Sequence, residues 1–164
     1  VKPGTVFPLT TNLKFDLTGN DVLPTNFDVS RSTDVPIPAT PDVKVSSIKW
    51  EELSLSQAKA NMELEILNTN SFPFDMNALD YGLKLGGIDV SKAQIRNETT
   101  FNPGELSTLS LDFDIQPSKM GLAAFNMLRS QDLDYEFVGD LDASTPYGPI
   151  KWKVDKNGNT PLLK

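Results

Sequence analysis

Pairs of aspartates two residues apart are the residues in this sequence whose spacing could support chemistry. The three pairs are Asp112 and Asp114, Asp132 and Asp134, and Asp140 and Asp142. On a β-strand this spacing places both carboxylates on one face, where they could hold a cation or act as a general acid–base pair. The same spacing is ordinary on the solvent-facing side of an acidic protein. Because the pairs alternate with apolar residues, we favour the solvent-facing interpretation and assign no catalytic residue.

The sequence lacks the residues that most catalytic and metal sites use. It contains no Cys and no His, which removes disulfides, thiolate nucleophiles, imidazole bases and structural zinc. We assign no metal site, no cofactor and no catalytic residue, and only carboxylates, Lys, Tyr and hydroxyls remain available for catalysis. The formal net charge is −7, which would repel a phosphate backbone, so we expect no nucleic-acid partner.

Three further motifs have a structural interpretation beside the functional one. Residues 155–159 begin like a calcium loop, but the glycine of such a loop is sixth, whereas Gly158 is fourth. We expect a hairpin or terminal turn there. The triplet beginning at Asn97 is a glycosylation sequon, which matters only in a eukaryotic secretory route. Trp50 and Trp152 could form a ligand platform, but both lie in alternating segments, and we interpret them as core residues.

Alternation of apolar and polar residues predicts the elements that must position these side chains. Period-two segments read as half-buried antiparallel strands. They fall at 43–50, 58–68, 79–85, 88–97, 109–115, 133–139 and 150–154. A slip between Val45 and Ile48 indicates a bulge, and Gly86-Gly87 predicts a hairpin turn. Asn102-Pro103-Gly104 predicts a second turn.

One segment changes to the helical period. The apolar residues of 118–129 recur at i, i+3, i+4, i+7 and i+8, which predicts a short amphipathic helix with Ser118 as its N-cap. We expect this helix to cover an open end or edge of the sheets. The fold class is therefore all-β, an Ig-like or fibronectin-III-like antiparallel β-sandwich with one short α-helix.

Residues 1–40 form a separate N-terminal segment, which precedes a domain at 41–164. Residues 13–19 share their layout with residues 133–139, and each is followed by a loop, a second alternating stretch and a Pro-Ile or Pro-Leu pair. Residues 1–38 are therefore either the last two strands of a preceding repeat or a chance match. As two strands they would need to dock, and we expect them to mediate association.

The sequence carries no apolar run of about 18 residues, so it predicts no transmembrane helix. It begins at Val1 rather than at a methionine, which fits a processed product or a shortened chain.

Residues 68–74 read Asn-Thr-Asn-Ser-Phe-Pro-Phe, and this segment resembles the Asn-Pro-Asn signature of the type 2 late embryogenesis abundant family. An alternating strand through Tyr81 to Gly87 follows, and then come the turn at 102–105, the helix and the strand that ends at Gly139. Thr69 stands where the family has proline, which leaves the turn less constrained. The motif residues of the resemblance are Asn68, Asn70, Pro73, Tyr81, Gly87 and Gly139.

The resemblance covers residues 41–164 and implies a bacterial-like member with a water-stress-and-hypersensitive-response (WHy) domain. It implies a non-catalytic role in desiccation or water stress and a protein, a glycan or a surface as the partner. Bacterial relatives tend to be exported and lipid-anchored, so we expect a periplasmic or outer-membrane-associated location, with any anchor outside these residues. Two alternatives stay open: a structural unit of a tandem-repeat surface protein, and a carboxylate-dependent glycan-active enzyme. The enzyme requires carboxylates from different strands to converge across a groove.

Overall fold

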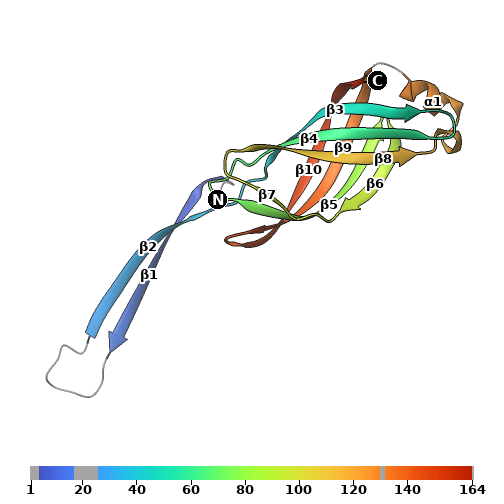
Figure 1. Cartoon of the computed structure of the whole chain (residues 1–164). Helices are drawn as coiled ribbons and strands as arrows, with labels where there is room; N and C mark the ends of the chain where they lie inside the picture. Colours follow the sequence, from blue (N-terminus) through green and yellow to red (C-terminus); the bar gives the residue numbers. More distant parts are fainter. Residues whose placement is uncertain (1–3, 17–25, 130–131, 164) are drawn as a thin grey trace. The chain divides into compact units, whose positions relative to one another are not determined.

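A computed structural model describes residues 4–16, 26–129 and 132–163. The chain divides into two compact units, Val1–Ala39 and Thr40–Lys164 (Figure 1). The first unit is an antiparallel hairpin of β1 (Val6–Asp16) and β2 (Asn26–Pro36). In the described part of the chain, no helix is long and apolar enough to cross a membrane.

The second unit is a sandwich of two β-layers. Its strands are β3 (Asp42–Leu53), β4 (Ala58–Leu67), β5 (Phe74–Leu85), β6 (Ile88–Ile95), β7 (Thr99–Phe101), β8 (Leu106–Ile115), β9 (Asp132–Thr145) and β10 (Gly148–Leu163). One layer has the order β6-β5-β9-β10, with β7 paired to β5, and the other has the order β3-β4-β8. Pairing within each layer is antiparallel. The all-β antiparallel sandwich expected from the sequence is therefore confirmed.

A short parallel contact joins the two layers. Near its end, β10 crosses to β3, where Leu162 pairs with Ile48 and Leu163 with Lys49. The predicted bulge in β3 is also present, because the register with β4 shifts between Val45 and Ser47. The shift brings Ile48, Trp50 and Val45 to the same buried side of the strand.

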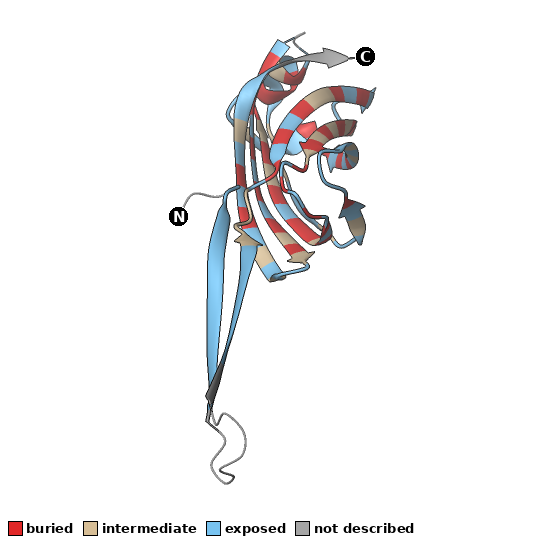
Figure 2. Cartoon of the chain, turned by 90° about the vertical axis from the view of Figure 1, so that its left-hand side faces the viewer, coloured by how far each residue is buried: buried red, intermediate tan, exposed pale blue. Residues whose placement is uncertain are grey.

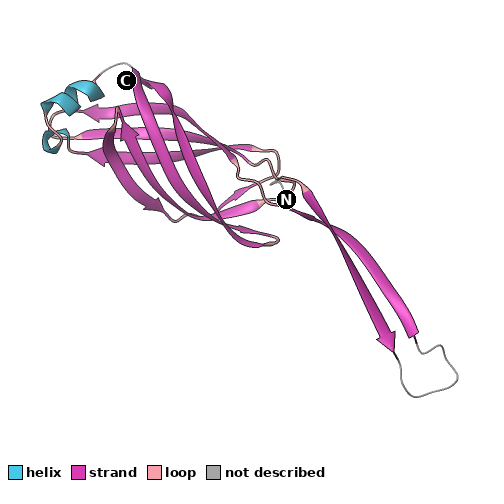
Figure 3. Cartoon of the chain, turned by 180° about the vertical axis from the view of Figure 1, so that it is seen from behind, coloured by secondary structure: helices cyan, strands magenta, loops and turns pink. Residues whose placement is uncertain are grey.

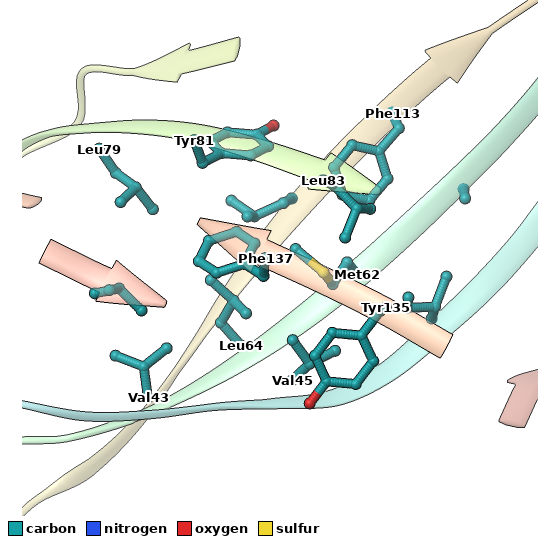
Figure 4. Close-up of a cluster of buried hydrophobic side chains, with 14 of the residues drawn as sticks. Val43, Val45, Met62, Leu64, Leu79, Tyr81, Leu83, Phe113, Tyr135 and Phe137 are labelled. Atoms are coloured by element: carbon teal, nitrogen blue, oxygen red, sulfur yellow. The ribbon is translucent and has the colours of Figure 1, made fainter. Parts of the chain in front are cut away.

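The core lies between the two layers and consists of alternate residues of nearly every strand. Figure 2 shows this as bands of buried and exposed residues along the strands. Figure 4 shows side chains from facing strands pointing toward one another, among them Met62, Leu83 and Phe137, each at most 1% exposed. Trp152 and Trp50 are both buried, which confirms that they are core residues.

The helical segment is shorter and more broken than the sequence suggested. A 3₁₀ turn, η1 (Pro117–Lys119), precedes the only α-helix of the described residues, α1 (Leu122–Leu128). Ser118 lies inside the 3₁₀ turn, so its prediction as the N-cap of the helix was wrong. The physical reason is Gly121, whose φ of +92° interrupts the helical path and makes it the N-cap, without a side-chain hydrogen bond. As expected, the helix covers one end of the sandwich (Figure 3), and it buries Leu128 completely.

The two closing strands are longer than expected. The turn predicted at Asn157-Gly158 was wrong, because both residues lie within β10 and pair with β9. Gly158 is opposite Tyr135, whose phenol lies over it so closely that a Cβ at Gly158 would be 2.9 Å from the hydroxyl oxygen. This glycine therefore marks a close approach inside a strand rather than a turn.

Candidate functional site

The turn after β4 is built around Asn68, a polar residue with no exposed surface. Its amide nitrogen donates to the carbonyl oxygens of Phe72 (2.9 Å) and Phe101 (3.0 Å). Its side-chain oxygen accepts from the backbone N–H of Asn70 (3.0 Å) and from the Asn70 amide (3.1 Å). The side chain therefore uses both donors and both acceptor positions, which is what a buried amide needs to be stable.

The backbone of Asn68 holds a second turn. Its N–H donates to the carbonyl of Glu105 (3.3 Å), and its carbonyl accepts from the N–H of Gly104 (2.8 Å). Gly104 has a φ of +68°, which explains the glycine of the Asn-Pro-Gly turn. One residue thus joins the turn at 68–73, the strand β7 and the turn at 102–105. Pro73 is exposed and lies immediately before β5, while Asn70 is 6% exposed inside the turn.

The other motif residues lie elsewhere in the sandwich and do not gather with Asn68. Tyr81 is buried on β5, where its ring stacks on Phe137 at 6.0 Å and meets Phe113 edge-on at 6.1 Å. Burial raises the pKa of the Tyr81 phenol, the charge of Asp112 raises it further, and a hydrogen bond with Ser91 acts in the opposite direction.

Two glycines of the motif set have different structural roles. Gly87 has a φ of +81° and forms the turn between β5 and β6, which confirms the predicted hairpin. Gly139 is in extended β9 and is buried, and a Cβ there would be 3.2 Å from Leu79 Cδ1. Tyr81 and Gly139 are direct partners in the β5–β9 ladder. The six motif residues therefore lie at three places: the turn at 68–73, this β5–β9 pair and the β5–β6 turn.

The first of the three aspartate pairs is held by neighbouring amides on the outer face of the β3-β4-β8 layer. Asn61 donates to Asp112 at 2.6 Å, and Gln57 donates to Asp114 at 2.9 Å. Both interactions are solvent-exposed. This arrangement fits the solvent-facing interpretation of the Asp112 and Asp114 pair.

The other two pairs lie on the outer side of β9. Asp134 accepts from Asn159 at 3.2 Å, and Asp142 pairs with Lys151 at 3.6 Å. Asp132 is at the beginning of the strand and is exposed, as is Asp140. In the described part of the chain, no group of three acidic residues is close enough to hold a metal ion.

A shallow hollow of about 650 Å³ opens on the outer face of the β6-β5-β9-β10 layer. Its charged lining residues come from four strands: Lys92, Asp80, Asp140, Lys153 and Asp155. The β-ladders place Gly82 between Lys92 on β6 and Val138 on β9, and they place Asp155 on the far side of Val138. Because Gly82 has no side chain, the space between the Lys92 and Val138 side chains is open to solvent.

Two carboxylates from different strands meet at this hollow, since Asp80 of β5 is the direct cross-strand partner of Asp140 of β9. Gln94 donates a hydrogen bond to Asp80, and Asp140 is opposite Lys153 on its other side. The glycan-active alternative requires such a juxtaposition, but within a groove. The hollow lies instead on an open sheet face, so binding is the chemistry that this arrangement supports best.

Of the lining residues, the sequence had indicated Tyr81 and Gly139 as motif residues and Asp140 as a member of an aspartate pair, but not the other charged residues. The available signal was Gly82, an isolated glycine inside an otherwise alternating strand, which often marks close approach by a ligand or another backbone. The charges around it could not be assigned to one place without the strand register. Asn97 of the sequon is exposed in the segment between β6 and β7.

Comparison with known proteins gives a consistent family and fold. The family model described as late embryogenesis abundant protein matches residues 63–158. A solution structure of a protein from Arabidopsis thaliana is similar, with 16% identity, a TM-score of 0.58, and coverage of 77% of this chain and 84% of that chain. A second solution structure, of a protein described as late embryogenesis abundant, has 18% identity and a TM-score of 0.52, and covers 76% of this chain and 72% of that one.

These structural likenesses show the fold, and no curated protein matches the chain. The family model covers more than half of the sequence, including the strands that carry Tyr81 and Gly139 and the turn at Asn68. The chain therefore belongs to the type 2 late embryogenesis abundant family.

Proposed function

We propose that the sandwich is a non-catalytic, water-stress-protective module of the WHy type. The observation that carries this proposal is the family match over residues 63–158, which supports a stress-related, non-enzymatic role. The Asn68 turn is consistent with it, because this buried hub makes all of its side-chain hydrogen bonds with the protein itself. Such a turn does not need bulk water to satisfy its polar groups.

The test is protection of a labile enzyme through drying and rehydration. A dehydrogenase dried with an equal mass of this protein should recover several-fold more activity than the enzyme dried alone. The matched control is an unrelated acidic globular protein of similar size and charge. The proposal fails if this control protects equally well, because the effect would then be ordinary surface coverage.

An exported location is also part of the proposal, because bacterial members of the family that the chain resembles tend to be exported. The measurement is fractionation of the producing cells, followed by detection with an antibody against the sandwich. Recovery with the envelope fraction is the expected result. Recovery with the cytosol would refute the location without affecting the protective role.

The hairpin supports a second candidate function, that of a structural unit in a tandem or multi-copy assembly. Because successive residues of a strand alternate between faces, β1 and β2 present an apolar row on one side, which the cross-strand pair of Thr11 and Arg31 interrupts. Its members are half-exposed: Phe7, Leu9, Leu13, Phe15 and Val29 are 44–50% exposed. The opposite side is polar and includes a hydrogen bond between Thr10 and Ser32 at 3.0 Å.

Complete burial of such side chains contributes about 1.5–3 kcal/mol each, so covering the exposed half of five gives about 4–8 kcal/mol. Two copies of this face packed together would gain about twice as much, which exceeds the lower estimates of association cost, about 4 kcal/mol. We therefore propose a second copy of the hairpin as the partner. This proposal rests on the apolar row and not on the internal repeat, because the strand pairing differs between the two similar segments. Leu13 pairs with Val29, whereas the corresponding Leu133 pairs with Thr160, near the end of β10.

Sedimentation velocity of the whole chain tests this association. The wild-type protein should sediment increasingly as an oligomer as its concentration rises, and a Leu9→Ser, Leu13→Ser variant should stay monomeric. Asn12→Ser, on the polar side, is the matched control and should behave like the wild type. A wild-type chain that is monomeric at about 100 μM, where an interaction of about 5.5 kcal/mol is half-saturated, would refute self-association.

A further inference from the structure

The outer face of the β6-β5-β9-β10 layer divides into paired charges around a group of unpaired ones. Around the hollow, Lys84 pairs with Glu136 at 3.4 Å and Lys151 pairs with Asp142 at 3.6 Å. Asp134 accepts from Asn159. Each of these charges therefore has a partner on a neighbouring strand, as is usual for cross-strand pairs.

Four charged residues that line the hollow break this pattern. Lys92, Asp140, Lys153 and Asp155 all lie on the exposed side of their strands. Among the described residues, none of the four has a side-chain hydrogen bond or an ion pair. Two ammonium groups and two carboxylates thus surround the same concave surface with their hydrogen-bonding capacity unused. Water satisfies them in the free protein, and a polar ligand could replace that water.

Between these charged residues, the surface of the hollow is formed by an apolar side chain and by a glycine without a side chain. Val138 is 51% exposed although it lies on the polar face of its strand. Beside it, Gly82 has no positive φ, and a Cβ there would be in ordinary contact with Val138 Cγ2 at 3.5 Å. The backbone therefore does not require glycine for conformation or for space. The absent side chain instead leaves the strand accessible to an approaching molecule.

The lining determines which ligands fit. A simple anion would meet three carboxylates, Asp80 included, and a simple cation would meet two lysines, so neither finds a lining of one sign. A hydroxyl group can donate to a carboxylate and accept from an ammonium group, which matches both signs. A molecule with several hydroxyls and a C–H face would also cover Val138.

From these observations we infer that the hollow over Gly82 is a binding site for polyhydroxylated small molecules, that is, saccharides or polyols. Asp140 and Asp155 would accept hydroxyl hydrogens, Lys92 and Lys153 would donate to hydroxyl oxygens, and Val138 would contact the ring face. The site is open and shallow, so binding is expected in the millimolar range. The inference stands apart from the protective role, because protection of a dried enzyme does not require this site.

The test is a titration of the isotopically labelled whole chain with a disaccharide, followed by amide chemical shifts. Saturable shifts should occur around Gly82 and Val138, with little change at the Asn68 turn. A Gly82→Val variant places a well-tolerated β-branched residue in the hollow and should weaken binding about tenfold or more. Asp142→Asn, on the same face outside the hollow, is the matched control and should bind like the wild type.

Two results would overturn the inference. In the first, the shifts are distributed over the whole surface, rise linearly with sugar concentration and are unchanged by Gly82→Val. In the second, inorganic phosphate or calcium moves the same amides at much lower concentrations than the disaccharide does, which would assign the hollow to ions. The enzyme-recovery assay measures drying protection by Gly82→Val independently of this titration, so the two proposals can fail separately.

Discussion

Replacing Asn68 with alanine should destabilise the sandwich far more than removing any surface amide. The change removes a hydrogen bond from four buried groups: the carbonyls of Phe72 and Phe101, and the backbone N–H and side-chain amide of Asn70. An unsatisfied buried polar group costs about 1–3 kcal/mol. With partial relaxation of the turn, we expect Asn68→Ala to lower the free energy of unfolding by about 3–5 kcal/mol, a large part of the 5–15 kcal/mol typical of a domain.

Urea unfolding followed by tryptophan fluorescence measures this loss, because Trp50 and Trp152 are both buried in the folded state. For a slope of about 2 kcal/mol/M, a loss of that size lowers the midpoint by about 2 M. The slope itself should be unchanged, since the variant buries nearly the same surface. Near-ultraviolet circular dichroism in buffer confirms that the starting state is folded.

Asn61→Ala is the matched control. The Asn61 amide nitrogen donates to Ser110 at 3.1 Å and to Asp112 at 2.6 Å, and its oxygen accepts from Ser110 at 3.2 Å, but all of these hydrogen bonds are exposed to solvent. Water replaces the lost partners, so the expected cost is below about 1 kcal/mol. If Asn68→Ala and Asn61→Ala lower the midpoint equally, the buried hydrogen bonds of Asn68 do not stabilise the sandwich more than exposed ones do.

Two further predictions concern the β5–β6 turn and the buried Tyr81 on β5. Gly86→Ala should lower the melting temperature more than Gly87→Ala. Both glycines have positive φ, but only a Cβ at Gly86 would overlap the sulfur of Met127. In a Met127→Ala background the two losses should become equal, and an undiminished difference would contradict this reasoning. Burial and the charge of Asp112 raise the pKa of Tyr81, so the unfolded chain loses this proton first as the pH rises past about 10. The stability that the Tyr81 phenol contributes is therefore complete below that pH and is lost above it. Urea midpoints measured from pH 8 to 11 should fall less steeply in Tyr81→Phe than in the wild type. Parallel curves would exclude a contribution of Tyr81 to the pH dependence of stability.

Local patterns predicted the strands because alternation is a property of neighbouring residues. The segment at 60–66 shows this, since each apolar residue in it is buried, as its period of two requires. The turns at Gly86-Gly87 and at Gly104 were also predicted, because positive φ selects glycine locally. The helix start was missed, because Ser118 satisfies the local cap pattern while Gly121, three residues later, interrupts the backbone path.

Contacts between distant strands could not be predicted in the same way. Asn68 donates to a carbonyl 33 residues further along the chain, and no local pattern gives that partner. The hollow depends on register in three ladders, which bring together Lys92, Val138 and Asp155. A shift of one residue in any of these ladders would turn the side chains to the other face. Glycines inside strands were the clearest signal left in the sequence, and Gly158 shows that they also mark close contact with an aromatic ring.

Buried polar groups in this fold bear on how it could withstand loss of water. In the described residues, the buried polar side chains are Asn68 and Asn70, and charged residues lie outside the core. Drying weakens hydrophobic burial, which depends on water, but it strengthens internal hydrogen bonds, because water no longer competes for their donors and acceptors. The Asn68 turn and the β-ladders are therefore the parts of the sandwich that gain relative strength as water is removed, whereas the unpaired charges around Gly82 are the parts that most need a substitute for it.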